Sequence, residues 1–144
     1  MQVKELMCPS VASVDPQDTA QNAAKLLAQH DVGALPVCGE DGGLRGVITD
    51  RDIVLRCVAV QEDPASTPVH KIMTRNCAVV SPTADVREAA HLMAAHQVRR
   101  LPVVEDDKVV GIVSLGDLSQ SHSCDMEAAA ALSDISAETR HPEM

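Results

Sequence analysis

The sequence predicts a mixed α/β (α+β) fold, in which two copies of one β-α-β-β-α unit are related by a pseudo-twofold axis. The prediction depends on three segments that return 65 or 66 positions later in the chain: residues 32–37 as 98–103, 46–53 as 111–118, and 3–7 as 69–73. Paired copies of this kind commonly hold a ligand at their seam. The duplication therefore also favours a binding protein.

The first copy shows the elements of the unit in order. Alanines and leucines at helical spacing mark its first helix, and apolar segments on either side of a Gly-rich turn mark a hairpin. The predicted elements are a strand at 11–14, a helix from Asp18 or Thr19 to His30, strands at 35–38 and 44–49 over the turn 40–43, and a helix at 50–58.

The second copy repeats this order with a hairpin turn one residue shorter. Its predicted elements are a strand at 78–80, a helix at 85–96, strands at 100–104 and 109–114, and a helix from Leu115 onward. We therefore divide the chain into a first motif (1–62), a second motif (63–122) and a C-terminal extension (123–144). We expect the extension to be either partly helical, with a short Ala-rich helix at 126–135, or disordered.

Composition limits the function further. The chain has 45% hydrophobic residues but no Phe, Tyr or Trp, so aliphatic side chains build the core and the walls of any site. This argues against single-stranded nucleic-acid platforms, which use aromatic faces. A net charge of −9 disfavours DNA binding in general. The N-terminus resembles no signal peptide and no apolar run is long enough to span a membrane, so we expect a cytoplasmic protein.

Cysteine and histidine give little sign of metal binding. The five cysteines are odd in number and no two have Cys-x-x-Cys spacing, which favours buried or half-buried free thiols over a disulfide or metal role. His30 and His96 are equivalent in the two copies, and each ends a helix, where a cation is favourable. We also find no motif of a known catalytic class, so the sequence predicts no enzyme, no catalytic residue and no metal site.

The candidate ligand residues lie where a strand gives way to a helix. Thr49 and Asp52 in the first copy correspond to Ser114 and Asp117 in the second. A hydroxyl at a helix start can approach a phosphate, and a carboxylate three residues on can accept from a ribose diol. The alternative is that all four residues only cap their helices. Spacing alone favours the cap.

Arg99 and Arg100 precede the strand at 100–104 and have no basic counterpart in the first copy. Arginine suits two-point contact with phosphate. A solvated turn pairing with nearby acids explains them equally well, so both interpretations stand at this point.

The repeated segments resemble the cystathionine-beta-synthase (CBS) domain, present as a tandem pair, or Bateman module, over residues 3 to about 122. The resemblance is carried by 31–37, 46–53 and 111–118 and by the lead-ins ending at Met7 and Thr74. It implies a homodimer of pairs and clefts that bind adenine nucleotides or related adenosyl ligands. It assigns the ribose to Asp52 and Asp117 and the phosphate to Thr49, Ser114, Arg99 and Arg100, and it places the purine against Val11, Ala12, Ala34, Ala78, Val79 and Arg100.

The predicted function is therefore a ligand-sensing regulatory module without an obligatory cofactor. Adenine nucleotide (AMP, ADP or ATP) is the expected regulatory ligand, and a separate protein is the expected partner. Two alternatives remain: a structural or interaction dimer with non-binding clefts, and a metal- or redox-responsive module. We expect no nucleic-acid or membrane partner.

Overall fold

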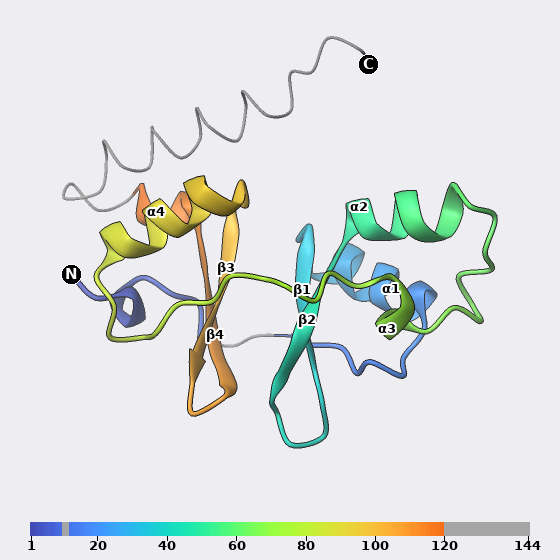
Figure 1. The fold of residues 1–144 in the computed structure, drawn as a ribbon, viewed down its shortest axis with the longest axis horizontal. Helices are drawn as coiled ribbons and strands as arrows, with labels where there is room; N and C mark the ends of the chain where they lie inside the picture. The colour runs from blue at the N-terminus through green and yellow to red at the C-terminus, as the bar shows by residue number, and fades with distance from the viewer. Residues whose placement is uncertain (10–11, 120–144) are drawn as a thin grey trace, which may run out of the picture. The chain divides into compact units, whose positions relative to one another are not determined.

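A computed structural model describes residues 1–9 and 12–119 of the chain (Figure 1). These residues form two compact units. The Asp52 unit comprises residues 12–77 and 106–109, and the Asp117 unit comprises the described parts of 1–11, 78–105 and 110–144. Val11 and the predicted helix at 126–135 lie outside the described residues.

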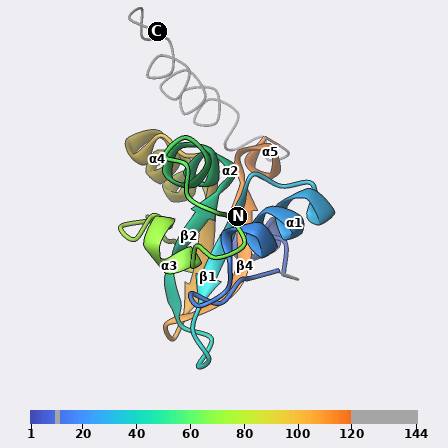
Figure 2. The same cartoon turned by 90° about the vertical axis from the view of Figure 1, so that its right-hand side faces the viewer.

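The Asp52 unit consists of one hairpin covered by helices (Figures 1 and 2). Its apolar side chains, including Leu27, Val37 and Ile48, form one core cluster. Its elements are α1 (Ala20–His30), β1 (Ala34–Cys38), β2 (Leu44–Thr49), α2 (Asp50–Ile53), the π-helical turns η2 (Val54–Val58) and α3 (Val69–Ile72).

The Asp117 unit repeats this plan around its own core cluster, in which Val86, Met93 and Leu101 are buried. A short 3₁₀ helix takes the place of α3. The elements are η1 (Val3–Glu5), α4 (Val86–His96), β3 (Arg100–Glu105), β4 (Lys108–Ser114) and α5 (Leu115–Leu118). Each unit thus holds a two-stranded sheet, β1-β2 or β3-β4, with helices packed against it.

The duplication extends to single hydrogen bonds. Thr74 and Val47 exchange two backbone hydrogen bonds of 2.8 and 2.9 Å, and Cys8 and Ile112 exchange two of 2.8 and 3.0 Å. Both helices α1 and α4 end on a non-glycine residue with positive φ, Asp31 at 52° and Gln97 at 54°. The two copies therefore share a backbone frame as well as a sequence pattern.

Each lead-in packs on the unit that does not contain the hairpin following it in sequence. Residues 69–77 belong to the Asp52 unit with β1 and β2, and the described residues of 1–11 belong to the Asp117 unit with β3 and β4. The predicted motifs follow the sequence repeat along the chain, whereas the compact units follow the packing of residues in space. The two divisions differ at the lead-ins, at residues 63–68 and at residues 106–109.

The predicted hairpins and long helices are present, and the bounds of β2 agree with the prediction at both ends. The predicted first strand of each copy is only a single parallel bridge, Val14 to Val37 and Val80 to Val103. Pro16 and Pro82 follow within two residues, and proline lacks the N–H that a longer ladder needs. The predicted helix at 50–58 is α-helical only at its start and then becomes π-helical, because Ala59 N bonds to Val54 O five residues earlier.

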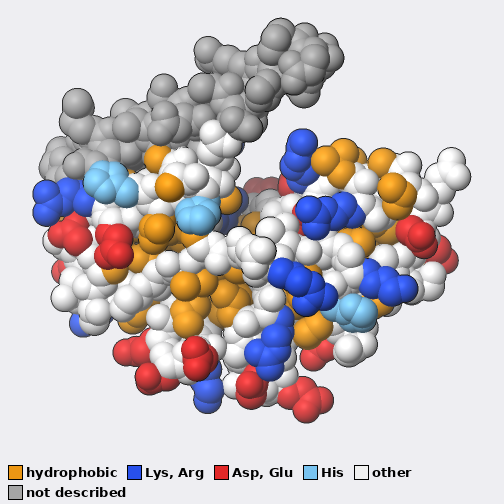
Figure 3. Space-filling view, viewed as in Figure 1, with side chains coloured by type: hydrophobic (Ala, Val, Ile, Leu, Met, Phe, Trp, Pro, Cys, Tyr) orange, Lys and Arg blue, Asp and Glu red, His pale blue; other side chains and the backbone are white. Residues whose placement is uncertain are grey.

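Charged groups lie mainly on the surface of both units. Glu40 and Asp41, and likewise Glu105, Asp106 and Asp107, are exposed on the hairpin turns (Figure 3). Among the described residues, no helix is both long and apolar enough to cross a membrane.

Candidate functional site

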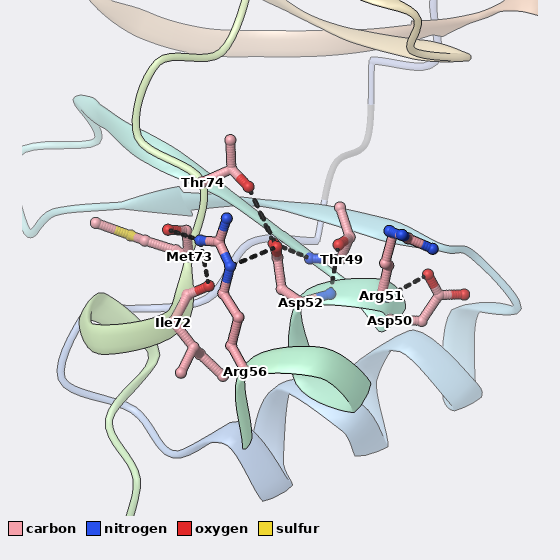
Figure 4. A network of polar contacts seen from close by, with 8 residues as sticks. All are labelled: Thr49, Asp50, Arg51, Asp52, Arg56, Ile72, Met73 and Thr74. Carbon is pink, nitrogen blue, oxygen red and sulfur yellow. Dashed lines mark hydrogen bonds and ion pairs between the residues drawn. The ribbon is translucent and has the colours of Figure 1, made fainter. Parts of the chain in front are cut away.

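The candidate site of the Asp52 unit is built on the start of helix α2 (Figure 4). Asp52 N donates to Thr49 Oγ1 over 2.9 Å, and Thr49 N donates to Asp52 Oδ2 over 3.1 Å. This reciprocal pair is a capping box, which satisfies two backbone donors at the helix start. The capping interpretation is therefore correct for both residues.

The carboxylate of Asp52 has further partners besides its cap. The hydroxyl of Thr74 donates to it, with Oγ1 at 3.2 Å from Oδ1 and 3.3 Å from Oδ2. Arg56 Nε lies 3.9 Å from Oδ1, one helical turn further along the chain. The Asp52 side chain is only 9% exposed, against 55% for Arg56. A buried carboxylate thus lies between a cap, a hydroxyl and a partly exposed guanidinium.

Gly46 explains how Thr74 comes so near. A Cβ added at Gly46 would lie 2.5 Å from the carbonyl oxygen of Thr74. Only glycine lets the lead-in cross β2 at this distance. The glycine three residues before Thr49 therefore positions a site residue from elsewhere in the sequence.

The Asp117 unit repeats the cap but not the surroundings. Asp117 N donates to Ser114 Oγ over 3.1 Å, and Ser114 N donates to Asp117 Oδ2 over 2.8 Å. Cys8 stands where the other unit has Thr74, and Asp117 is half-buried rather than buried. The two caps are alike, whereas the two carboxylates differ in environment.

The other predicted residues have different surroundings in the structure. Ala34 is the first residue of β1 and pairs with Thr49 in the sheet. Arg99 O accepts from Leu115 N over 2.8 Å, so Arg99 lies next to the start of α5 through its backbone. Ala12 and Ala78 pack against the cores of the two units, Arg100 is half-buried, and Val79 is 41% exposed.

Sequence reasoning missed two residues of the Asp52 site, Thr74 and Arg56. Arg56 follows Asp52 at the i,i+4 spacing of a helical ion pair, and that signal could have identified it. Thr74 is 22 positions from Asp52, and nothing local in the sequence joins them.

The thiols are placed partly as predicted. The described cysteines differ in exposure: Cys57 is buried, Cys38 and Cys77 are half-buried, and Cys8 is exposed against expectation. Burial raises the pKa of the Cys38 and Cys77 thiols, so both stay protonated near neutral pH. Within residues 1–9 and 12–119, no three His, Cys, Asp or Glu side chains are grouped as metal ligands.

The chemistry available at each cap is acceptance of hydrogen bonds. A carboxylate has about four lone-pair positions, and the cap amide takes one of them. At Asp52 the Thr74 hydroxyl can turn its proton away from the carboxylate, which leaves those lone pairs for a ligand. Such a group can accept from a diol.

Comparison with known proteins gives a consistent picture. A sequence model of the CBS domain matches residues 3–58 and 69–121. CBS domain-containing protein YhcV of Bacillus subtilis (strain 168) is 45% identical over 139 residues, which cover 96% of this chain and 98% of that protein. Hypoxic response protein 1 of Mycobacterium tuberculosis is 36% identical over 117 residues, or 81% of this chain and 82% of that protein.

Solved structures agree with these sequence matches. Hypoxic Response Protein I, solved with two coordinated zinc ions, has a TM-score of 0.78 and 35% identity, covering 83% of this chain and 98% of that one. The CBS domain pair of protein MJ0100, in complex with 5′-methylthioadenosine and S-adenosyl-L-methionine, has a TM-score of 0.75 and 30% identity, covering 83% and 94%.

Proposed function

The chain belongs to the CBS domain family, with two copies of the domain in tandem, and from that premise we propose that it is a ligand-sensing regulatory module. The proposed ligand class is adenosyl compounds, with an adenine nucleotide (AMP, ADP or ATP) as the regulatory ligand. The module has no proposed catalytic step. It acts in the cytoplasm through a separate protein partner.

One observation supports this proposal above the others. In both copies a carboxylate lies three residues after the N-cap residue of a helix, and the backbone amide of that N-cap residue donates to its Oδ2. We propose that the remaining acceptor positions of Asp52 and Asp117 bind the ribose hydroxyls. The MJ0100 domain pair, with its two bound adenosyl compounds, supports this ligand class by similarity.

The remaining predicted residues complete the proposed sites. Thr49 and Ser114 lie at helix starts, which suits a nearby phosphate. We propose that Arg99 and Arg100 bind phosphate in the Asp117 unit. The purine would lie against small aliphatic side chains, for which we propose Val11, Ala12, Ala34, Ala78 and Val79.

Regulation requires that the ligand distinguish two arrangements of the protein. A ligand shifts an equilibrium only by its difference in affinity for the two states. We propose that binding of the ligand changes the surface that contacts the partner protein.

We further propose that the protein forms a homodimer through the exposed face of α2 and η2. Val54, Leu55 and Val58 are 46–56% exposed, with Val58 four positions after Val54 and three after Leu55, and Val60 is 58% exposed. A contiguous apolar face of this kind is typical of an interaction site. It also supports the alternative of an interaction dimer with non-binding sites.

Calorimetric titration with AMP, ADP, ATP, 5′-methylthioadenosine and S-adenosylmethionine tests the proposal and its alternative. Intrinsic fluorescence is unsuitable because the chain has no Trp or Tyr. We expect binding of at least one compound, and weaker binding after Asp52→Asn or Asp117→Asn. A dimer in sedimentation that gives no heat with any of them at millimolar concentration would favour the interaction dimer and refute the sensor.

A further inference from the structure

A basic hollow lies on the surface of the Asp52 unit, next to the candidate site. Its volume is about 580 Å³, within the range of small-molecule sites. Four of its seven lining residues are basic or histidine: Arg56, His70, Lys71 and Arg75. The others are Met73, Thr74 and Asn76. Figure 3 shows Lys and Arg side chains gathered around a histidine on this unit.

The charge of the hollow is unusual for this protein. The chain carries a net charge of −9, yet no acidic side chain lines the hollow within the part of the chain that the structure describes. Asp52 contacts two of the lining residues, Thr74 and Arg56, but its carboxylate is buried and lies 3.9 Å from Arg56 Nε. An anion entering the hollow therefore meets mainly positive charge.

Two of the cations are held in place by the backbone. Arg56 Nη1 donates to the carbonyl oxygens of Ile72 and Met73, both at 3.3 Å, and Arg75 Nη2 donates to His70 O at 2.8 Å. Each guanidinium keeps further N–H groups for a ligand, because arginine has five donors. Holding these side chains lowers the entropy lost when an anion binds.

The hollow is not a necessary result of the fold. At the corresponding lead-in positions of the Asp117 unit, Lys71 is replaced by Glu5 and Arg75 by Pro9, while His70 is replaced by Lys4. Glu5 there accepts from Gln2 N at 2.6 Å. Among the described lead-in residues, the cations of the hollow therefore have only one basic counterpart in the Asp117 unit, Lys4.

We propose that the basic hollow binds the phosphoryl groups of a small anion with two or more phosphates. Lys71 supplies a mobile point charge, whereas Arg56 and Arg75 supply fixed, directional donors that match phosphate oxygens. The side-chain amide of Asn76 adds a neutral donor beside them. This binding does not depend on Asp52 holding a sugar.

Inorganic pyrophosphate is the probe that tests this proposal, by calorimetric titration at low ionic strength. We expect it to bind the full chain, and we expect Lys71→Gln and Arg75→Gln each to weaken binding roughly tenfold, since each removes a charge-assisted contact. Both side chains are exposed, and thermal melting followed by circular dichroism checks that the variants fold.

Matched controls remove the same charges elsewhere in the same unit. Lys25→Gln lies on the exposed side of α1, and Arg45→Gln breaks an exposed contact with Asp41 on the β hairpin. We expect less than about a twofold change in both, because screened charges outside the hollow contribute little. No heat with pyrophosphate, or equal weakening in controls and hollow variants, would overturn the proposal.

Asp52→Asn separates this proposal from the proposed function. We expect the variant to lose affinity for 5′-methylthioadenosine, which has no phosphate, and to keep its affinity for pyrophosphate. Titration with ADP then identifies the source of the phosphates. Weakening by both Asp52→Asn and Lys71→Gln indicates a nucleotide that spans both places, and weakening by Asp52→Asn alone indicates separate phosphate compounds in the hollow.

Discussion

The two units have the same backbone frame but different polar surroundings at equivalent carboxylates. Asp52 is buried and contacts Thr74 and Arg56, whereas Asp117 is half-buried and, among the described residues, its carboxylate bonds only to the amide of Ser114. The capping boxes at the helix starts are the same in both. The cap therefore belongs to the fold, whereas the surroundings of the carboxylate can change independently.

The lead-ins carry most of this difference. In the Asp52 unit the lead-in supplies Thr74 to the carboxylate and Lys71 and Arg75 to the basic hollow. The lead-in of the Asp117 unit has Cys8 and Glu5 at the matching positions. Substitutions at these positions can therefore make the two units more alike or more different.

Substitution of Gly46, one of the two motif glycines, should have as large an effect on stability as any change that follows. Gly46→Ala places a Cβ 2.5 Å from a backbone oxygen that β2 holds in place, so we expect a loss of about 1–3 kcal/mol in the free energy of unfolding. Gly111→Ala should cost somewhat less, because its Cβ would lie 2.9 Å from the backbone oxygen of Cys8, and the contact at 2.6 Å is with the flexible side chain of Met7. Urea unfolding followed by circular dichroism measures both.

Gly116→Ala is the control for this comparison. Its Cβ would be 3.7 Å from the nearest atom, and alanine favours a helix by roughly 0.5–1 kcal/mol. An equal loss for Gly46→Ala and Gly116→Ala would contradict the role given to the close crossing of the lead-in.

The two aspartates should differ in their contribution to stability. We expect Asp52→Ala to cost about 1.5–3 kcal/mol, since it removes a buried charged acceptor from the Thr49 amide and the Thr74 hydroxyl. Asp117→Ala should cost about 1 kcal/mol, as for the loss of one cap. Unfolding of both variants under one set of conditions makes the comparison, and a larger loss at Asp117 would reverse it.

Thr74→Cys makes the Asp52 site resemble the other unit. The variant loses the hydroxyl that donates to Asp52, and we expect a loss of about 0.5–1.5 kcal/mol. The same exchange in the opposite direction, Cys8→Thr, provides the matched comparison. A stability unchanged by Thr74→Cys would show that the hydroxyl contact contributes nothing in solution.

Lowering the pH should weaken the N-cap of α4 but not that of α1. This is the smallest of the four predicted effects on stability. Thr19 caps α1, whereas Asp85 caps α4 and bonds to Arg87 N at 2.8 Å. Hydrogen bonds from the Arg87 side chain and backbone lower the pKa of Asp85. Its stabilisation is therefore present above the unfolded pKa of about 3.9 and is lost as pH falls through the lower folded value.

Replacing Asp85 by threonine tests this pH dependence. In Asp85→Thr the cap no longer titrates, so the decline of stability below about pH 3.9 should become shallower than in the original chain. Urea midpoints across pH 2–5 give the measurement. Superimposable pH profiles for the two proteins would contradict the assignment.

The sequence predicted most elements because their signals are local. The strand at 44–49 follows a Gly-rich turn, and α4 begins at a capping aspartate, so neighbouring residues determine both. The first strand of each copy depends on a distant partner, and there the structure has only the bridges at Val14 and Val80. The helices η1 and α3 of the lead-ins were not predicted, since each is only three or four residues long.

In the candidate site, too, the local contacts were predicted from the sequence and the long-range contacts were missed. The spacing of Thr49 and Asp52 indicates both a cap and a ligand contact, and the structure has the cap. Thr74 was missed because its approach depends on Gly46 and on packing across 22 positions. The basic hollow was missed for a similar reason, because Arg56 joins His70, Lys71 and Arg75 only in the folded unit.

The proposed function depends above all on Asp52 and Asp117 binding the hydroxyls of a ribose. Its most direct test is a double comparison: the affinities of adenosine monophosphate and of its 2′,3′-dideoxy analogue, each measured by calorimetry on the original chain and on Asp52→Asn and Asp117→Asn. We predict that the analogue binds the original chain at least about tenfold more weakly, and that this penalty falls in the variant whose site is occupied. Equal affinity of the original chain for both compounds would contradict the claim.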